Sequence, residues 1–397
     1  MTVRQGFNFL MTLGPTNIPG RILRAMHRPA IEFQGHEFIE YSRACHQDIK
    51  PLFQTKNEVF IYSANGHGAW EAALTNTLST GDRVLVPETG QFSLSWMEMA
   101  ETLGITGEYL TNDWRHGIDP DEVETHLVDD KDREIKAVLA VQTDTATGIT
   151  SDIAAVRLAM DAADHPALLM VDTVASLVTT EFRMDEWGVD VAVGGSQKGM
   201  MMPPGLSFTA ASNKAQKIGE TANLPRNYWD WRKRRGQSHY TWYCGTAPEH
   251  LIFGLREAID MVIEEGLEGA HRRHQWLASA VRAAVEVWAK AGALELNAVV
   301  EEQKSNSIST ILVADGIDVE KIHTVCRDHF DVALGYGLGQ LDGRSFRIGH
   351  MGYVNAPMII ATLGCIETVF GTCGIPHGKG GIMAALDSLA NDDAVPA

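Results

Sequence analysis

The central part of the chain alternates short apolar runs with segments long enough to form helices, and this alternation restricts the fold more than any other feature. Strands buried on both faces of a sheet are apolar throughout, and helical crossovers join them when they run parallel. The sequence therefore predicts a large α/β domain built on a mainly parallel sheet between helices. The apolar runs are residues 59–61, 84–86, 135–141, 167–171, 189–193 and 206–211.

The pattern changes near Gly266, where residues 267–291 are predicted to form one long amphipathic helix. Short strands and helices follow in α+β order. A chain of 397 residues is too long for one small core and suits such a division. We expect an N-terminal arm at 1–22, a large domain at 23–266 and a smaller C-terminal α+β domain at 267–397. The later elements are strands 307–313, 332–334 and 346–348 and helices 319–330 and 357–370.

Charge and composition exclude several classes of protein. The formal net charge of −18 argues against a general nucleic-acid binder, because phosphate binding needs a basic surface. We find no run of about 18 apolar residues and no secretory signal, so we expect no membrane partner and a cytoplasmic location. The five cysteines are scattered and never spaced as C-x-x-C, so neither a disulfide framework nor a metal site is expected.

Two residues with complementary chemistry follow predicted strands. Asp172 directly follows the apolar run 167–171, at the carboxyl end of the predicted strand, where open α/β sheets bind ligands. Lys198 follows the run 189–193 within Gly-Gly-Ser-Gln-Lys-Gly, and partial burial would make its amine a nucleophile toward carbonyls. A pyridoxal cofactor needs an amine for its aldehyde and a carboxylate for its pyridinium nitrogen. The pair therefore predicts a pyridoxal phosphate site.

A third motif spans residues 63–71, Ser-Ala-Asn-Gly-His-Gly-Ala-Trp-Glu, between a predicted strand and a predicted helix. A small-residue turn at a helix start offers backbone N–H groups and the positive end of the helix dipole to an anion. The motif is neither G-x-G-x-x-G nor a P-loop. It therefore predicts a phosphate cradle. An NAD-dependent oxidoreductase would need a glycine fingerprint after the first strand, which this sequence lacks.

These three motifs, in this order, resemble the class V, fold-type I aminotransferases, especially the alanine–glyoxylate and serine–glyoxylate enzymes. The resemblance runs from residues 13–19 to residues 346–350, and its most specific parts are 171–176 and 195–198. It implies the fold-type I architecture, with a seven-stranded sheet, and pyridoxal phosphate as cofactor. It also implies ping-pong transfer of an amino group from a small amino acid to glyoxylate or another short 2-oxo acid.

The resemblance also implies roles for individual residues around the cofactor. Lys198 holds the cofactor covalently and, once freed, moves a proton between Cα of the substrate and C4′. Asp172 keeps the pyridine nitrogen protonated. The other implied contacts are Gly66, His67 and Gln197 with the phosphate, Phe92 stacked on the ring, and Thr147 near the ring hydroxyl.

Further implied roles concern the substrate and a second subunit. Arg347 is expected to bind the substrate carboxylate, because its planar guanidinium matches a carboxylate in two hydrogen bonds. The backbone near Gly14 and Thr16 is expected to close over the same group. Tyr243 and Thr246 are spaced like a Tyr-x-x-Thr pair that reaches the neighbouring subunit's phosphate, which implies a homodimer with shared active sites.

Some alternatives stay open. Residues 143–148 and 245–250 depart from the pattern of the bacterial relatives, so the donor stays open among serine, alanine, aspartate, ureidoglycine and pyridoxamine. A cysteine desulfurase-like lyase needs a mobile cysteine in a small-domain loop, whereas Cys326 falls inside a predicted helix. The run 229–235, Trp-Asp-Trp-Arg-Lys-Arg-Arg, could stack bases, but in so acidic a chain we favour a solvated loop near the active-site mouth.

Overall fold

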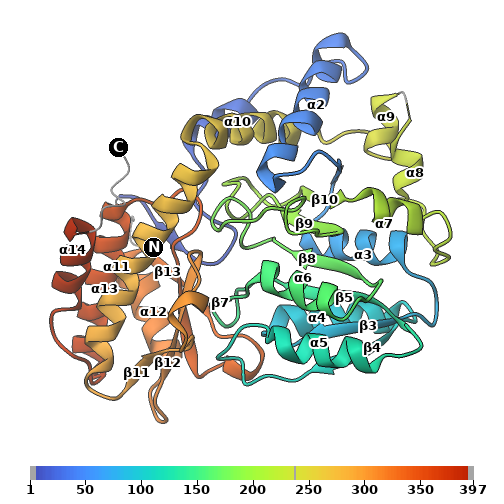
Figure 1. Ribbon diagram of the computed structural model, residues 1–397. Coiled ribbons are helices and arrows are strands. Elements are labelled where there is room, and N and C mark those ends of the chain that lie inside the picture. Colours follow the sequence, from blue (N-terminus) through green and yellow to red (C-terminus); the bar gives the residue numbers. More distant parts are fainter. Residues whose placement is uncertain (1–5, 237, 392–397) are drawn as a thin grey trace.

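The computed structural model describes residues 6–236 and 238–391, which form two domains side by side (Figure 1). The large domain is built on a seven-stranded sheet of order β2-β10-β9-β8-β5-β3-β4. Every pairing in it is parallel except the two made by β10, which confirms the predicted mainly parallel sheet. Its strands are β2 (Glu58–Tyr62), β3 (Arg83–Pro87), β4 (Thr106–Leu110), β5 (Ile135–Val141), β8 (Leu168–Asp172), β9 (Val191–Gly195) and β10 (Ser207–Ala211).

Helices cover both faces of this sheet, as β8 illustrates. Leu168 and Met170 belong to one buried cluster, and Leu169 and Val171 belong to the other. Successive side chains of a strand point to opposite faces, so a strand buried on both sides is a continuous apolar run. The helices of this domain are α1 (Gly20–Met26), α2 (His36–Asp48), α3 (Gly66–Thr77), α4 (Gln91–Thr102), α5 (Pro120–Asp129), α6 (Ile153–Ala162), α7 (Asn213–Ile218), α8 (Trp231–Arg234), α9 (His239–Trp242) and α10 (Glu249–Glu265).

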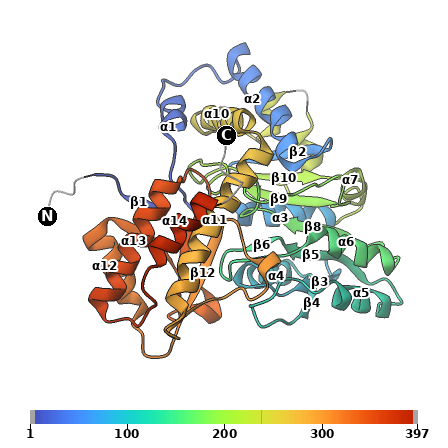
Figure 2. The ribbon, with the colours of Figure 1, turned by 60° about the vertical axis from the view of Figure 1, so that its left-hand side comes forward.

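The small domain has a five-stranded sheet of order β1-β13-β14-β12-β11. Its helices gather beside that sheet in both ribbon views (Figures 1 and 2). Gly266 separates α10 from α11, at the position where the sequence pattern changes. The elements are β1 (Phe9–Met11), β11 (Leu294–Leu296), β12 (Ile308–Val313), β13 (Val332–Tyr336), β14 (Ser345–Gly349), α11 (Leu267–Ala289), α12 (Val319–Phe330), α13 (Ala356–Cys373) and α14 (Gly381–Asn391).

The N-terminal arm is divided between the two domains. Strand β1 pairs in parallel with β13 and so extends the small sheet. Helix α1 lies on α10, where Arg21 binds Glu257 and Glu264. The segment between them, around Gly14, therefore spans the junction of the two domains. A three-residue strand is too short to show a periodicity, and the sequence did not predict it.

Among the described residues, α13 is the one helix long and apolar enough to cross a membrane by length and composition. The helix itself was predicted at residues 357–370, but its apolar length was not. The apolar side chains of α13 that lie in the core of the small domain account for this composition. They are Ile359, Leu363, Ile366, Val369 and Phe370.

Candidate active site

A cavity of about 240 Å³ lies at the carboxyl edge of the large sheet, where β8 and β9 end. Asp172 and Lys198, which the sequence analysis paired, both line it. Parallel pairing places Asp172 opposite Val193, so the loop after β9 returns Lys198 to the same edge. The structure thus brings together most of the predicted cofactor residues. The others in this cavity are Gly66, His67, Phe92 and Gln197, with Gly14 from the arm.

Lys198 is a buried amine without a protein partner. Lys198 is only 8% exposed, and in residues 6–236 and 238–391 no acceptor lies within hydrogen-bond distance of Nζ. Nζ lies 5.9 Å from the centroid of the Phe92 ring. Burial lowers the pKa of Lys198 to about 8, although the negative charge of Asp172 acts in the opposite direction. Roughly half of such amines are neutral at pH 8, and the neutral amine is the nucleophile.

The pH dependence of this amine can be tested directly. We expect the reactivity of Lys198 in cofactor-free protein to rise with pH through a midpoint near 8, below the ordinary lysine value of 10.5. Because the charge of Asp172 raises the pKa of Lys198, Asp172→Asn should move the midpoint to lower pH. Competitive acetylation at a series of pH values, read by mass spectrometry against a reference amine, measures it. An ordinary lysine profile would contradict the burial argument.

Asp172 is held in one orientation by two donors. Its Oδ1 accepts a hydrogen bond from the backbone N–H of Val174 at 2.6 Å, and its Oδ2 accepts one from Trp70 Nε1 at 3.0 Å. Burial raises the pKa of Asp172 to about 7, against the lowering effects of the Val174 bond and the Lys198 charge. A carboxyl group fixed in this way can share a proton with a ring nitrogen. No role was predicted for Trp70 from the sequence, although it lies within the motif 63–71.

The start of α3 provides the expected anion site. Asn65 caps the helix by accepting from Gly68 N at 3.3 Å, and within the described parts of the chain no carbonyl pairs with the N–H of Gly66 or His67. Gln197 adds an amide whose oxygen is buried without a partner. No arginine is among the described residues that line this cavity. A phosphate here would therefore depend on backbone N–H groups and the helix dipole.

Asp144 organises one wall of the cavity, and the sequence analysis did not assign it a role. It is fully buried, and its carboxylate accepts from Phe92 N at 2.9 Å, Ser93 N at 3.3 Å and Ala146 N at 2.9 Å. Burial raises the pKa of Asp144 to about 6, while these three bonds lower it. Phe92 and Ser93 begin α4, so the carboxylate neutralises that helix terminus and fixes the position of the Phe92 ring.

Thr145, rather than the predicted Thr147, lines the cavity. Thr147 is fully buried and its hydroxyl donates to the carbonyl of Thr89 at 3.0 Å, so it faces away from the cofactor space. The two threonines lie two residues apart in the loop between β6 (Thr143–Asp144) and β7 (Ile149–Thr150). The sequence located the loop but not which hydroxyl turns inward.

An adjoining cavity of about 440 Å³ shares Gly14, Phe92, Thr145 and Lys198 with the first and contains Arg347. Arg347 is only 5% exposed and donates from Nε to the carbonyl of Tyr336 at 2.5 Å and from Nη1 to that of Thr145 at 2.6 Å. In the described ranges it has no carboxylate partner, and Nη2 is unused. Burial lowers the pKa of Arg347 to about 10. A buried cation of this kind is a site for an anionic ligand.

The two arm residues predicted near the substrate have different positions. Gly14 has a φ of +115°, and a Cβ on it would lie 2.8 Å from Lys198 Cε, so only glycine allows the arm to approach this closely. Thr16 binds the loop after β9 instead, because its Oγ1 donates to the carbonyl of Lys198 at 3.2 Å. Thr16 therefore holds the arm in place and does not line either cavity.

Tyr243 and Thr246, expected to reach a second subunit, line neither cavity. The Tyr243 hydroxyl shares a hydrogen bond of 2.6 Å with Ser42 of α2, in the interior of this chain. Thr246 is exposed. Their contact with a partner's phosphate stays a prediction.

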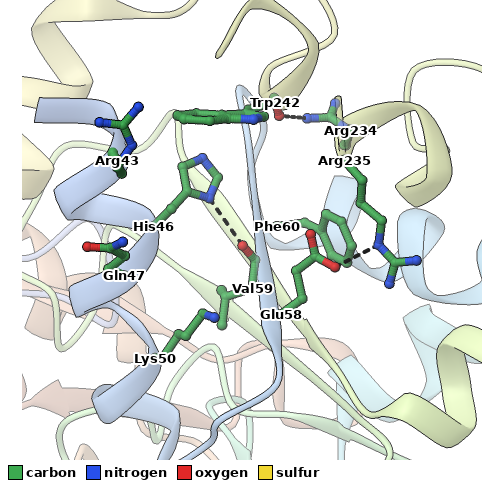
Figure 3. A pocket seen from close by; sticks show the side chains of 10 residues that line it. All are labelled: Arg43, His46, Gln47, Lys50, Glu58, Val59, Phe60, Arg234, Arg235 and Trp242. Carbon is green, nitrogen blue, oxygen red and sulfur yellow. Dashed lines mark hydrogen bonds and ion pairs between the residues drawn. The ribbon is translucent and has the colours of Figure 1, made fainter. Parts of the chain in front are cut away.

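A third, separate pocket, of about 290 Å³, lies between α2, β2 and the α8–α9 segment (Figure 3). It shares no lining residue with the Lys198 cavities and contains none of the predicted site residues. Arg234 donates here to the carbonyls of Ile61 at 3.2 Å and Trp242 at 2.8 Å, and also binds that of Tyr228. These bonds join three elements. The predicted chemistry therefore belongs to the cavities around Lys198.

The basic and aromatic run 229–235 borders this separate pocket and is not the solvated loop that we expected. Trp231 is buried and stacks on Phe60, with ring centroids 5.2 Å apart and planes within 4°. Arg234 is also buried. Carbonyl acceptors and aromatic neighbours compensate for the free-energy cost of burying Trp231 and Arg234. The composition of the run itself does not reveal these partners.

A buried lysine and a buried aspartate on one cavity, beside a helix start suited to phosphate, define a pyridoxal phosphate enzyme of fold type I. The family model of the class V aminotransferases matches residues 20–340, and the chain belongs to this family. Its cofactor is pyridoxal 5′-phosphate. The unpaired amine of Lys198, the oriented carboxyl of Asp172 and the open N–H groups of α3 fit that cofactor.

Relatives match almost the whole chain. The L-aspartate–glyoxylate aminotransferase of Paracoccus denitrificans is 42% identical over 94% of this chain and 93% of that protein. The serine–glyoxylate aminotransferase of Methylorubrum extorquens is 40% identical over 99% and 98%. Among solved structures, the ureidoglycine–glyoxylate aminotransferase of Bacillus subtilis superposes with a TM-score of 0.89 at 26% identity, covering 98% of this chain and all of that one.

Proposed function

We propose that this chain transfers the amino group of a small amino acid to glyoxylate or another short 2-oxo acid, in two half-reactions at one site. The observation that supports this most is Arg347, a buried guanidinium that faces the Lys198 cavity without an acidic partner in the described ranges. Amino acids and 2-oxo acids share the α-carboxylate that such a group binds. The names of the two curated relatives place glyoxylate among the acceptors to test first.

The residues divide the work between binding and proton transfer. When bound, pyridoxal phosphate supplies an aldehyde that bonds to amines and a ring that accepts electrons. Arg347 would orient the substrate by its carboxylate, and Lys198, which would hold the cofactor between turnovers, would move the proton from Cα with its Nζ. Asp172 would hold a proton at the pyridine nitrogen, and Phe92 would pack on the ring. Burial of these groups excludes water from the reacting atoms.

The experiment is a half-reaction screen of the holoenzyme. The purified protein should be yellow, and its visible absorbance should bleach when the correct donor among alanine, serine and aspartate is added. Glyoxylate or pyruvate should then restore the band. Absence of bleaching with any small amino acid would contradict the proposal. Sulfide release from cysteine should stay at the level of Lys198→Ala, because no cysteine is among the described residues that line either cavity.

Arg347→Ala should weaken carboxylate substrates by about 2–3 kcal/mol, because it removes a charge-assisted hydrogen-bond pair. KM should rise about 30- to 150-fold, the equivalent of that energy. Cofactor absorbance should survive. The matched control is Arg344→Ala, an exposed arginine that precedes β14 and lines neither cavity. Loss of cofactor in Arg347→Ala would show that its role is different.

We also propose that the active enzyme is a cytoplasmic homodimer that binds neither nucleic acid nor membrane. A dimer is supported by the phosphate end of the cavity, where the described lining residues include no arginine, and by the exposed Thr246. Donors from a second copy, at Tyr243 and Thr246, would complete that end. Sedimentation of the wild type and of Thr246→Ala, with cofactor affinity measured on both, tests this arrangement.

A further inference from the structure

His323 lies in the wall of the 440 Å³ cavity that also contains Arg347 and Lys198. It belongs to α12, is only 3% exposed, and stacks on the ring of Tyr336 with centroids 3.9 Å apart. In the described parts of the chain neither of its ring nitrogens has a hydrogen-bond partner. A buried polar side chain left unpaired is costly, so this ring is a place where a ligand group can be received.

The ring is uncharged, which restricts the group that it can receive. Burial lowers the pKa of His323 to about 4; the charge of Glu320 acts in the opposite direction, and those of Arg327 and Arg347 act in the same direction as burial. A neutral imidazole offers one N–H donor and one acceptor nitrogen. A hydroxyl group, which is also both donor and acceptor, matches it. A carboxylate has no proton to donate and would be buried against an uncharged ring.

The other cation of this wall is poorly placed to bind a buried carboxylate. Arg327 is 47% exposed on its side chain, and its Nε binds Asp328 at 2.9 Å. Its Nη1 donates to the Tyr336 hydroxyl at 3.5 Å. Apart from Lys198, whose amine would hold the cofactor, Arg347 is therefore the buried cation among the described residues of this wall, and the substrate's α-carboxylate would occupy it.

We infer that His323 determines donor specificity and that the preferred donor is a β-hydroxy amino acid such as serine. With the α-carboxylate on Arg347 and the amine toward Lys198, the donor's side chain would extend toward the remaining wall, which includes His323 and Tyr336. This inference deepens the proposed function and rests on it. The two relatives, which differ in their amino donor, are 42% and 40% identical to this chain, and these similar values do not decide between aspartate and serine. The inference about His323 favours serine.

Serine and alanine differ by a single hydroxyl group, so their ratio isolates the contact with His323. The measurement is kcat/KM of the holoenzyme's half-reaction with serine, alanine and aspartate. In His323→Leu the value for serine should fall about 10- to 100-fold, the size of one lost hydrogen bond, while that for alanine changes less than about threefold. His323→Asn, which keeps a donor and an acceptor, should recover part of the serine rate. His329→Leu, an exposed position on the same helix, is the control.

The outcomes distinguish the inference about His323 from the proposed transamination. An equal loss of kcat/KM with serine and with alanine in His323→Leu would show that His323 has only a structural role. A wild-type preference for aspartate that disappears in Arg327→Ala would show that Arg327 binds the side-chain carboxylate of the donor. Either result overturns the inference. In both cases alanine would still bleach the cofactor, so the proposed transamination would stand. If no amino acid bleaches it, the proposed function itself fails and the inference with it.

Discussion

Lys198→Ala should lose turnover by a factor on the order of 10⁴, because it removes the only described amine in the cofactor cavity, which serves as both covalent anchor and proton carrier. The variant should still fold, since in the described ranges Nζ forms no hydrogen bond whose loss would strain the core. Its visible absorbance should change from that of the wild type when pyridoxal phosphate is added. Steady-state rates, spectra and thermal unfolding measure these effects.

The matched control is Lys214→Ala. The Lys214 amine lies beside the amino end of β9, where it binds the carbonyl of Ala167 at 3.0 Å and Asp190 at 3.3 Å. That variant should keep its rate and can lose stability. A small added amine should restore part of the activity of Lys198→Ala, because the truncated side chain leaves space in the cavity. Wild-type turnover in Lys198→Ala would refute the assignment of the catalytic amine.

The strands of the large sheet and the pairing of Asp172 with Lys198 were predictable from the sequence because both depend on burial. The run 135–141 coincides with β5, in which every residue except Lys136 is apolar and buried, as expected for a strand covered on both faces. Asp172 and Lys198 each follow such a strand, and parallel strands end at one edge of a sheet. Two separated polar residues could therefore be placed on one cavity from the sequence alone.

The residues that the sequence missed depend on which way a loop or side chain turns. Thr145 and Thr147 are chemically alike, and the hydrogen bonds of Thr147 to the carbonyls of Thr89 and Asp144 distinguish them. Asp144 has its role because three N–H groups from two segments converge on it. His323 is an ordinary histidine of an amphipathic helix in sequence, and its position in the wall follows from how α12 packs on the small sheet. No local pattern encodes these contacts.

Asp172→Asn should keep the size of the side chain and lose most of its catalysis. The single amide oxygen can accept only one of the two hydrogen bonds, from Val174 N or from Trp70 Nε1, and the amide has no negative charge to hold a proton on the pyridine nitrogen. Without that proton the ring accepts electrons poorly, so kcat should fall by a factor on the order of 10²–10⁴, as for loss of a positioned acid–base group. KM should change far less, because Arg347 still binds the carboxylate. Half-reaction rates from absorbance changes measure this directly.

Asp190→Asn provides the control that separates charge loss from damage to the sheet. Asp190 is as buried as Asp172, at 5% exposed for both, and it accepts from Leu169 N at 3.0 Å in the same sheet. It lies before β9 rather than after β8, away from the cofactor. Its replacement should therefore lower the unfolding temperature while the rate per folded molecule stays near that of the wild type. Equal loss of rate in both variants would show that Asp172 acts by supporting the sheet and not by holding a proton at the cofactor.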